Sequence, residues 1–200
     1  MNETYKVQVQ DLVDDLKAVF THAGLGGEAG EYKLLTQSFL YKFLNDKFLY
    51  QAQVLDAGNT YENLLTMSEE DYDWLLEDIG TSTAWLKPDQ LIETLHRQQN
   101  EATFYEIFEN TLNQIAIDNN DIFSVHTDGD TAIRLFDERL ITDNISDSSK
   151  RNEVAKAIIN LLTRVKFDET IFSQGFDFFS TLFEYMIKDY NKDGGGKYAE

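Results

Sequence analysis

Residues 35–48 read Leu-Thr-Gln-Ser-Phe-Leu-Tyr-Lys-Phe-Leu-Asn-Asp-Lys-Phe, with large apolar side chains at intervals of three and four residues. An α-helix has 3.6 residues per turn, so this spacing gathers the apolar side chains on one side of a helix. The positions concerned are Leu35, Phe39, Leu40, Phe43, Leu44 and Phe48. The stretch therefore predicts a long helix whose aromatic face lies in a protein core.

The same spacing extends over most of the chain on both sides of this stretch. Further apolar stripes lie within residues 9–20, 72–79, 91–95, 104–115, 132–140, 154–165 and 176–187. Only residues 122–127 resemble a strand, and that segment is short. The chain is therefore predicted to be all-α, a multi-helix bundle of roughly eight helices with at most a short strand near 122–127.

Three short segments indicate where helices begin or end. Residues 24–27, Gly-Leu-Gly-Gly, are expected to end the first helix, because glycine readily adopts the conformations that close a helix. Ser68 precedes three acidic residues, which is typical of an N-cap followed by acids that complement the helix dipole. Pro88, the single proline, is expected at the first position of the next helix.

Composition favours one soluble, cytoplasmic domain. With 200 residues, 42% of them apolar, the chain can bury a core without a disulfide or a structural metal. It contains no cysteine, which excludes disulfides, thiolate metal sites and a cysteine nucleophile. The first residues lack the pattern of a signal peptide, and no apolar run approaches the roughly 20 residues that a membrane-spanning helix needs.

The chain is strongly acidic, with 36 acidic and 17 basic residues and a net charge of −19. Such a charge repels the phosphate backbone and disfavours nucleic-acid binding by the isolated chain. A solubilising surface is the default interpretation. Docking onto a basic partner and mimicry of DNA are the alternatives.

No pattern in the chain indicates a catalytic residue or a bound cofactor. His22, His96 and His126 are scattered and form no i, i+4 pair. Residues 24–29, Gly-Leu-Gly-Gly-Glu-Ala, fit the G-x-G-x-x-A nucleotide fingerprint. That motif requires a strand before the glycines, whereas residues 16–22 have helical spacing, so we interpret the segment as a loop.

The last residues match the calcium loop of an EF-hand, D-x-[DN]-x-[DN]-G-x5-E. The oxygen ligands would come from Asp189, Asn191, Asp193 and Glu200. Gly196 stands where EF-hands place an apolar residue, and neither an exit helix nor a second loop is present. We therefore expect no metal site here and keep calcium binding as an alternative.

One stretch of the acidic chain is basic. It contains Lys150, Arg151, Lys156, Arg164 and Lys166, with Glu153 among them. A solvated helix face is the default interpretation. Contact with DNA phosphates is the alternative, because lysine and arginine bind phosphates without sequence preference.

Two segments resemble type I restriction–modification methyltransferase subunits. Tyr32-Lys33 followed by Phe-Leu-Tyr-Lys-Phe-Leu-Asn-Asp at 39–46 is similar to a Tyr-Lys pair leading into F-L-K-x-L-S-D, although Asn45 stands where serine is usual. Residues 183–187, Phe-Glu-Tyr-Met-Ile, and then 197–200, Lys-Tyr-Ala-Glu, resemble Y-E-Y-L-I and the later G-K-x-A-G-E. The resemblance covers nearly the whole chain, but residues 56–103 match only in helical pattern.

The resemblance implies a helical N-terminal domain over 1–193 and a glycine-rich hinge over 194–200, leading to a catalytic domain outside this chain. The full-length protein would then be an adenine-N6 DNA methyltransferase that uses S-adenosylmethionine, and this part alone would be inactive. Its N-P-P-[FY] motif is absent here, because the single proline excludes it. The resemblance implies DNA, a second methyltransferase subunit, and the specificity and restriction subunits as partners.

The resemblance thus predicts a DNA-clamping and subunit-assembly domain. Two alternatives remain open: a calcium-binding protein with one EF-hand-like loop, and an acidic protein-interaction or anti-restriction module.

Overall fold

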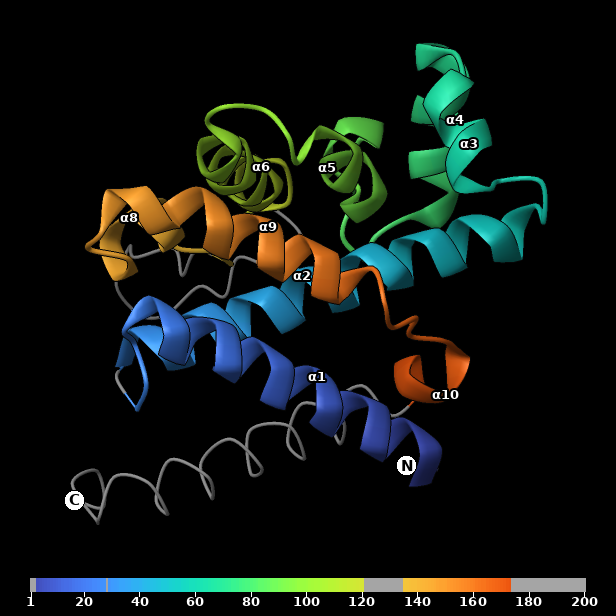
Figure 1. Ribbon diagram of the computed structural model, residues 1–200. Coiled ribbons are helices and arrows are strands. Elements are labelled where there is room, and N and C mark those ends of the chain that lie inside the picture. The colour runs from blue at the N-terminus through green and yellow to red at the C-terminus, as the bar shows by residue number, and fades with distance from the viewer. Residues whose placement is uncertain (1–2, 28, 121–134, 174–200) are drawn as a thin grey trace, which may run out of the picture.

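A computed structural model of the chain describes residues 3–27, 29–120 and 135–173, and every regular element among them is helical (Figure 1). This confirms the predicted all-α fold. The predicted strand near 122–127 and the predicted helix over 176–187 lie outside the described residues. The α-helices are α1 (Glu3–Ala23), α2 (Ala29–Leu55), α3 (Tyr61–Thr66), α4 (Glu69–Ile79), α5 (Ile92–Gln98), α6 (Phe104–Asp118), α8 (Leu140–Asn144), α9 (Arg151–Leu162) and α10 (Glu169–Phe172).

Helix α9 is the centre of the bundle. It packs against α1, α5, α6 and α8 and also contacts α2 (Figure 1). Its apolar side chains are almost fully removed from water, including Val154, Ile158, Ile159 and Leu162. These positions belong to the stripe predicted over 154–165, so the periodicity there correctly identified a core face.

Helix α2 has 27 residues and is therefore about 40 Å long. It is buried around its circumference near the middle, where six consecutive residues, 41–46, are all shielded from water. The sequence predicted a single apolar face, and that part of the prediction was too narrow. Because the other faces are covered as well, Lys42, Asn45 and Asp46 lie inside the protein.

The α3–α4 segment projects from the bundle over the C-terminal part of α2 (Figure 1). Thr60 and Ser68 cap the two helices, and the Ser68 hydroxyl accepts a hydrogen bond from the Asp71 N–H at 3.2 Å. Gly80 ends α4 with a φ of 63°, a conformation that favours glycine. The N-cap predicted at Ser68 is therefore confirmed.

Two predicted helices begin later than the sequence indicated. Pro88 opens a separate 3-10 turn, η1 (Pro88–Gln90), and α5 begins at Ile92 after the extended residue Leu91. The apolar stripe over 132–140 predicted a helix, but residues 135–139 form bends and turns, and α8 begins at Leu140. The Asp137 N–H donates to the Gln37 side chain at 2.8 Å, so a long-range contact replaces the helical bond there.

A second 3-10 turn, η2 (Ser148–Lys150), leads directly into α9. No helix in the described parts of the chain combines the length and apolarity required to cross a lipid bilayer.

Candidate functional site

The segment that resembles the methyltransferase motif forms a buried polar network on α2. Lys42 and Asp46 are one helical turn apart, and the Lys42 Nζ lies 2.8 Å from Asp46 Oδ2. The Asn45 side-chain amide donates to Asp46 Oδ1 at 2.8 Å. The side chains of Lys42 and Asp46 are only 5% and 6% exposed, so these charges neutralise each other inside the protein.

Each remaining acceptor of this network holds the backbone of a distant segment. Asn45 Oδ1 accepts the Ile92 N–H at 2.9 Å, at the start of α5. Asp46 Oδ2 accepts the Phe167 N–H at 2.8 Å, in the segment between α9 and α10. The network therefore fixes two other parts of the chain to the middle of α2.

The chemistry of the network indicates a structural role. Burial lowers the pKa of the Lys42 ammonium, although the Asp46 carboxylate opposes this effect by attraction and hydrogen bonding. Both Asp46 oxygens already accept hydrogen bonds from the protein. An exposed general base or a ligand-binding carboxylate would need a free acceptor, so we assign this group to the framework of the fold.

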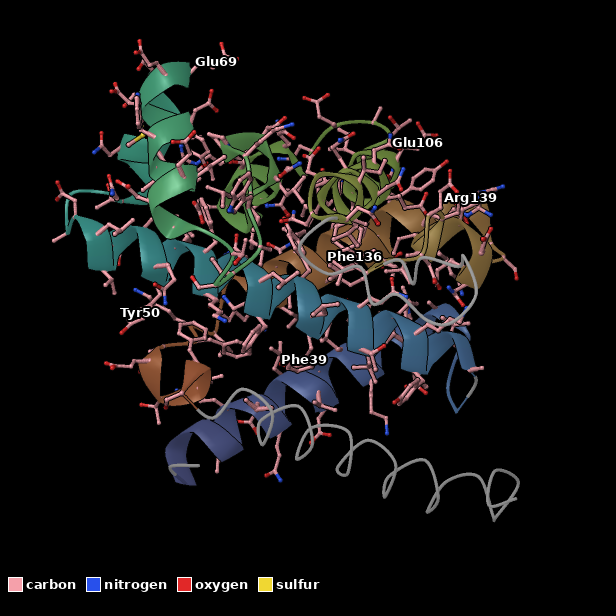
Figure 2. All side chains as sticks on the ribbon, turned by 180° about the vertical axis from the view of Figure 1, so that it is seen from behind. Phe39, Tyr50, Glu69, Glu106, Phe136 and Arg139 are labelled. Atoms are coloured by element: carbon pink, nitrogen blue, oxygen red, sulfur yellow. The ribbon has the colours of Figure 1, made fainter. Side chains whose placement is uncertain are left out.

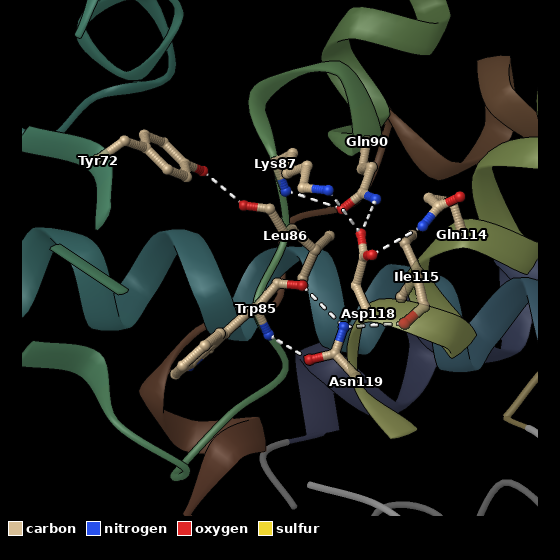
Figure 3. A network of polar contacts seen from close by, with 9 residues as sticks. All are labelled: Tyr72, Trp85, Leu86, Lys87, Gln90, Gln114, Ile115, Asp118 and Asn119. Atoms are coloured by element: carbon tan, nitrogen blue, oxygen red, sulfur yellow. Dashed lines mark hydrogen bonds and ion pairs between the residues drawn. The ribbon is translucent and has the colours of Figure 1, made fainter. Parts of the chain in front are cut away.

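A second polar network connects α4 and α6 with the segment between them (Figure 3). The Tyr72 hydroxyl of α4 donates to the Leu86 carbonyl oxygen at 2.5 Å. Asn119, after α6, accepts the Trp85 N–H at 2.6 Å and donates to the Trp85 carbonyl at 2.8 Å. These bonds hold α4 in one position relative to the bundle.

Asp118 completes this network. Its carboxylate accepts from the side-chain amides of Gln90 and Gln114 at 2.8 and 2.7 Å and lies 3.2 Å from the Lys87 ammonium. Partial burial would raise the pKa of Asp118, but these hydrogen bonds and the Lys87 charge outweigh it and lower the pKa. The group is therefore a stable anion that orders the segment before α5.

The basic residues for which DNA contact is the alternative interpretation do not form one patch. Lys150 and Arg151 lie at the start of α9, whereas Arg164 and Lys166 follow its end, about 18 Å away along a 12-residue helix. Lys156 lies between the two groups. The stretch therefore comprises two separate basic groups rather than one continuous surface.

The first group contacts the ends of other helices. The Lys150 Nζ donates to the His22 carbonyl oxygen at 3.4 Å, in the last turn of α1. The Arg151 guanidinium donates to the carbonyl oxygens of Ile145 and Thr142 at 3.0 and 3.3 Å, at the end of α8. Cations are favourable at these carboxyl-terminal helix ends, which explains both residues structurally.

The second group is more exposed. The Arg164 guanidinium lies 3.8 Å from the Asp15 carboxylate, and both side chains are more than half exposed. Lys166 lines a hollow of about 280 Å³ that also includes Asp46 and Asp168. Whether either group contacts DNA stays a prediction.

The histidines are separate, as the sequence predicted for the two that the structure describes. The His96 Nε2 lies 3.1 Å from the Asn160 side-chain oxygen, and His22 lies at the end of α1. Within residues 3–27, 29–120 and 135–173, no group of three or more histidine or carboxylate side chains is arranged so that it could hold a metal ion. His126 and the calcium-loop residues Asp189, Asn191, Asp193 and Glu200 lie outside the described residues.

The glycine loop at 24–27 connects two helices. Helix α1 precedes it and α2 follows it, so the strand that a nucleotide fingerprint requires is absent at this place. Gly24 and Gly27 have positive φ angles of 99° and 75°, as expected where a chain leaves one helix and turns into another. The interpretation of this segment as a loop is confirmed.

The outer face of α4 is the feature that the sequence interpretation missed. Trp74 is 61% exposed there and lines a shallow hollow together with four carboxylates, Glu69, Glu70, Asp73 and Glu77. Figure 2 shows Glu69 at the tip of the projecting helix. The available signal was the charge pattern, because residues 48–86 contain eight acidic side chains and no lysine, arginine or histidine.

Comparison with models of known protein families, with curated proteins and with solved structures finds no match to this chain.

Proposed function

We propose that this chain is the DNA-clamping and subunit-assembly domain of a type I restriction–modification adenine-N6 DNA methyltransferase. The observation that carries the proposal is the position of the motif residues Lys42, Asn45 and Asp46. Burying polar and charged groups is costly unless each finds a partner, and here each of the three residues has its partners within the fold. The similarity of this motif to the methyltransferase motif therefore concerns residues that hold the fold together, and is more than a similarity in helical composition.

The proposal assigns catalysis to a domain outside this chain. Pro88 is followed by aspartate, so no N-P-P motif is present to hold a flipped adenine. S-adenosylmethionine would bind to the same catalytic domain, and the complete enzyme would act in the cytoplasm on DNA. This chain would contribute contacts to DNA, to a second methyltransferase subunit and to the specificity and restriction subunits.

Contact with DNA is proposed for the exposed part of the basic stretch. Arg164 and Lys166 have headgroups near solvent, whereas the Arg151 guanidinium is bonded to carbonyl oxygens of α8. Reversing Arg164 and Lys166 to glutamate in the complete methyltransferase should weaken binding to every DNA sequence. It should also make the dependence of affinity on salt shallower. Binding that contacts fewer phosphates releases fewer counterions.

Lys150 and Lys156 complete the test in the same enzyme. If the start of α9 also contacts phosphates, reversing them adds a comparable loss. Unchanged affinity and an unchanged salt slope for both pairs would contradict the DNA-clamp proposal.

The decisive test of identity is the gene. We expect its reading frame to continue past Glu200 into a segment with a glycine-rich methyl-donor turn and an N-P-P-[FY] motif. The product, together with its specificity subunit, should transfer tritiated methyl groups from S-adenosylmethionine to adenine in DNA. The isolated chain should show no heat of binding with that cofactor in calorimetry. A reading frame that stops at Glu200 would contradict the proposal.

A protein-interaction module is the second candidate, and the exposed tryptophan of α4 favours it.

Calcium binding by the chain is tested separately by following the melting temperature during a Ca²⁺ titration. An ion that binds only the folded state raises that temperature. A rise of several degrees at sub-millimolar Ca²⁺ would support the EF-hand alternative.

A further inference from the structure

The two faces of α4 differ in what they contact. Its inner face packs into the core through Tyr72, Leu75 and Ile79. Its outer face carries Trp74 among carboxylates at positions 70, 73 and 77, which the spacing of three and four residues places side by side. An amphipathic helix of this kind normally has a polar outer face, so the exposed indole there requires an explanation.

Helix stability accounts for only part of this face. Acidic residues in the first turn, such as Glu69 and Glu70, are favourable near the positive end of the helix dipole. Asp73 and Glu77 lie beyond that turn, and like charges one helical turn apart repel each other. The arrangement is therefore unfavourable for the isolated helix from Asp73 onward.

In the parts of the chain that the structure describes, no basic side chain forms an ion pair with these carboxylates. The ion pairs that lysine and arginine form within the described residues lie elsewhere. The nearest stretch of sequence, residues 48–86, contributes eight acidic groups and no basic one. The surface is thus complementary to a positively charged partner.

The neighbouring region shows which chemistry fits such a surface. Arg97 of α5 lies over the ring of Tyr61, 4.8 Å from its centre, and forms an ion pair with Glu62 on α3. One guanidinium thus contacts an aromatic ring and a carboxylate at the same time. Trp74 and its flanking carboxylates present the same two groups without a cation among the described residues, and tryptophan is the strongest cation–π acceptor among the aromatic side chains.

We propose that the outer face of α4 binds an arginine- or lysine-containing segment of a partner protein. A guanidinium stacks on the Trp74 indole, and further basic side chains pair with Asp73, Glu77 and Glu70. From residue 69 to residue 77 the helix rises about 12 Å, which suits a segment with a few basic residues. Nucleic acid is repelled by the same charges.

The position of α4 favours binding without rearrangement. The Ser68 cap fixes its start, and the hydrogen bond from Tyr72 to Leu86 fixes it against the bundle. A surface that is already ordered loses little conformational entropy when a partner binds. This inference depends only on the α4 surface and holds whether or not the chain belongs to a methyltransferase.

The test uses the full chain and a fluorescein-labelled peptide with four arginines separated by serines, followed by fluorescence anisotropy. One variant neutralises the surface by Glu70→Gln, Asp73→Asn and Glu77→Gln. The matched control carries Asp11→Asn, Glu101→Gln and Glu153→Gln, which changes the net charge equally at exposed positions far apart in the sequence. Circular dichroism confirms that both variants are folded.

We expect the α4 variant to raise the dissociation constant about tenfold and the control to change it less than about twofold, because short-range pairing exceeds the general attraction. Trp74→Ala should raise the constant about threefold at 0.15 M salt and keep its effect at higher salt, since stacking is less screened than exposed ion pairs. Equal losses in the two triple variants would overturn the proposal. So would a peptide that binds the wild-type chain no better than the α4 variant.

Discussion

The middle of α2 and the outer face of α4 both carry charged side chains, in opposite surroundings. On α2, Lys42 and Asp46 are removed from water and paired, and the Asp46 carboxylate also holds the Phe167 backbone. On α4, Asp73 and Glu77 are in water, and no basic group among the described residues pairs with them. One helix uses charge inside the molecule and the other presents it outside.

Buried and exposed charges give different information about the protein. A buried charge is tolerated only when its partners are in place, so the polar residues of α2 report on the fold. An exposed carboxylate has little effect on stability, so the charged residues of α4 give information about binding partners. Substitutions on α2 should therefore change stability, and substitutions on α4 should change binding.

The largest effect is expected for Asp46→Ala. The change leaves the Lys42 ammonium buried without a counter-charge, and it leaves the Phe167 N–H without an acceptor. Breaking a buried pair in this way costs about 3–5 kcal/mol of unfolding free energy. Urea denaturation followed by circular dichroism measures the loss. Glu77→Ala on α4 is the matched removal of an exposed carboxylate and should change stability by less than about 0.5 kcal/mol. Similar losses of unfolding free energy in Asp46→Ala and Glu77→Ala would contradict the difference between α2 and α4.

Asn45→Ala should cost less, about 1–3 kcal/mol, because it leaves the buried Ile92 N–H without its acceptor while the ion pair survives. Asn45→Ser sharpens the comparison, since serine is usual at this position in the methyltransferase motif that the segment resembles. A serine hydroxyl close enough to bond with Asp46 should recover part of the loss. A serine variant as unstable as the alanine variant would count against the proposed relation to those methyltransferase subunits.

Tyr72→Phe tests the bond that fixes α4 to the bundle. Removing the hydroxyl leaves the Leu86 carbonyl without this donor and should cost about 1–2 kcal/mol in urea unfolding. Peptide binding to the outer face should weaken only slightly, because Trp74 and the carboxylates remain. A large loss of binding at unchanged stability would contradict this separation of roles.

The same tyrosine predicts a dependence of stability on alkali. Burial, and then the Asp89 carboxylate, raise the pKa of Tyr72, so the folded state favours the neutral phenol. Its contribution is therefore fully present below the unfolded pKa of about 10 and is lost as the pH rises through the folded value. Tyr41 has a raised pKa for the same reasons. In Tyr72→Phe, unfolding free energy measured from pH 8 to 11 should decline less steeply than in the wild type, and Tyr41 should contribute to the slope that remains.

The smallest effect on stability is expected for Trp74→Ala. The indole is 61% exposed, so its removal takes little area out of the core and should change the unfolding free energy by less than about 0.5 kcal/mol. A loss above 2 kcal/mol in urea unfolding would show that Trp74 contributes to the core, as the buried residues of α2 do.

The sequence predicted well those features that depend on neighbouring residues. The spacing of Phe39, Phe43 and Phe48 placed them in the core, and the Ser68 cap was confirmed. Both signals are local, because helix periodicity and capping involve residues within a few positions of one another.

The features that were missed depend on distant partners. Asn45 and Asp46 are buried because Ile92 and Phe167 require their oxygens, and these partners lie 47 and 121 residues away. The apolar stripe ending at Leu140 predicted a helix too early because Gln37, 100 residues away from Asp137, takes its N–H. Periodicity contains no information about such contacts.

The α4 surface was missed for a different reason. The net charge gave the sign of the surface but not its position. A local count over residues 48–86 locates the excess of acid, yet it does not reveal that Trp74 points outward rather than into the core. Tyr72 and Trp74 are two positions apart and therefore about 200° apart around the helix, so the burial of Tyr72 leaves Trp74 on the outer face.

The hydrogen bond between Asp46 and the Phe167 backbone also has a consequence during protein synthesis. After the ribosome has added Asp46, 121 further residues must follow before its partner exists. At 5–20 residues per second this takes roughly 6–24 s. The ammonium of Lys42, one helical turn away, is already present throughout that interval and is positioned to neutralise the waiting carboxylate. The contact between α2 and the segment before α10 can therefore form only late in synthesis, after most of the described helices have been added.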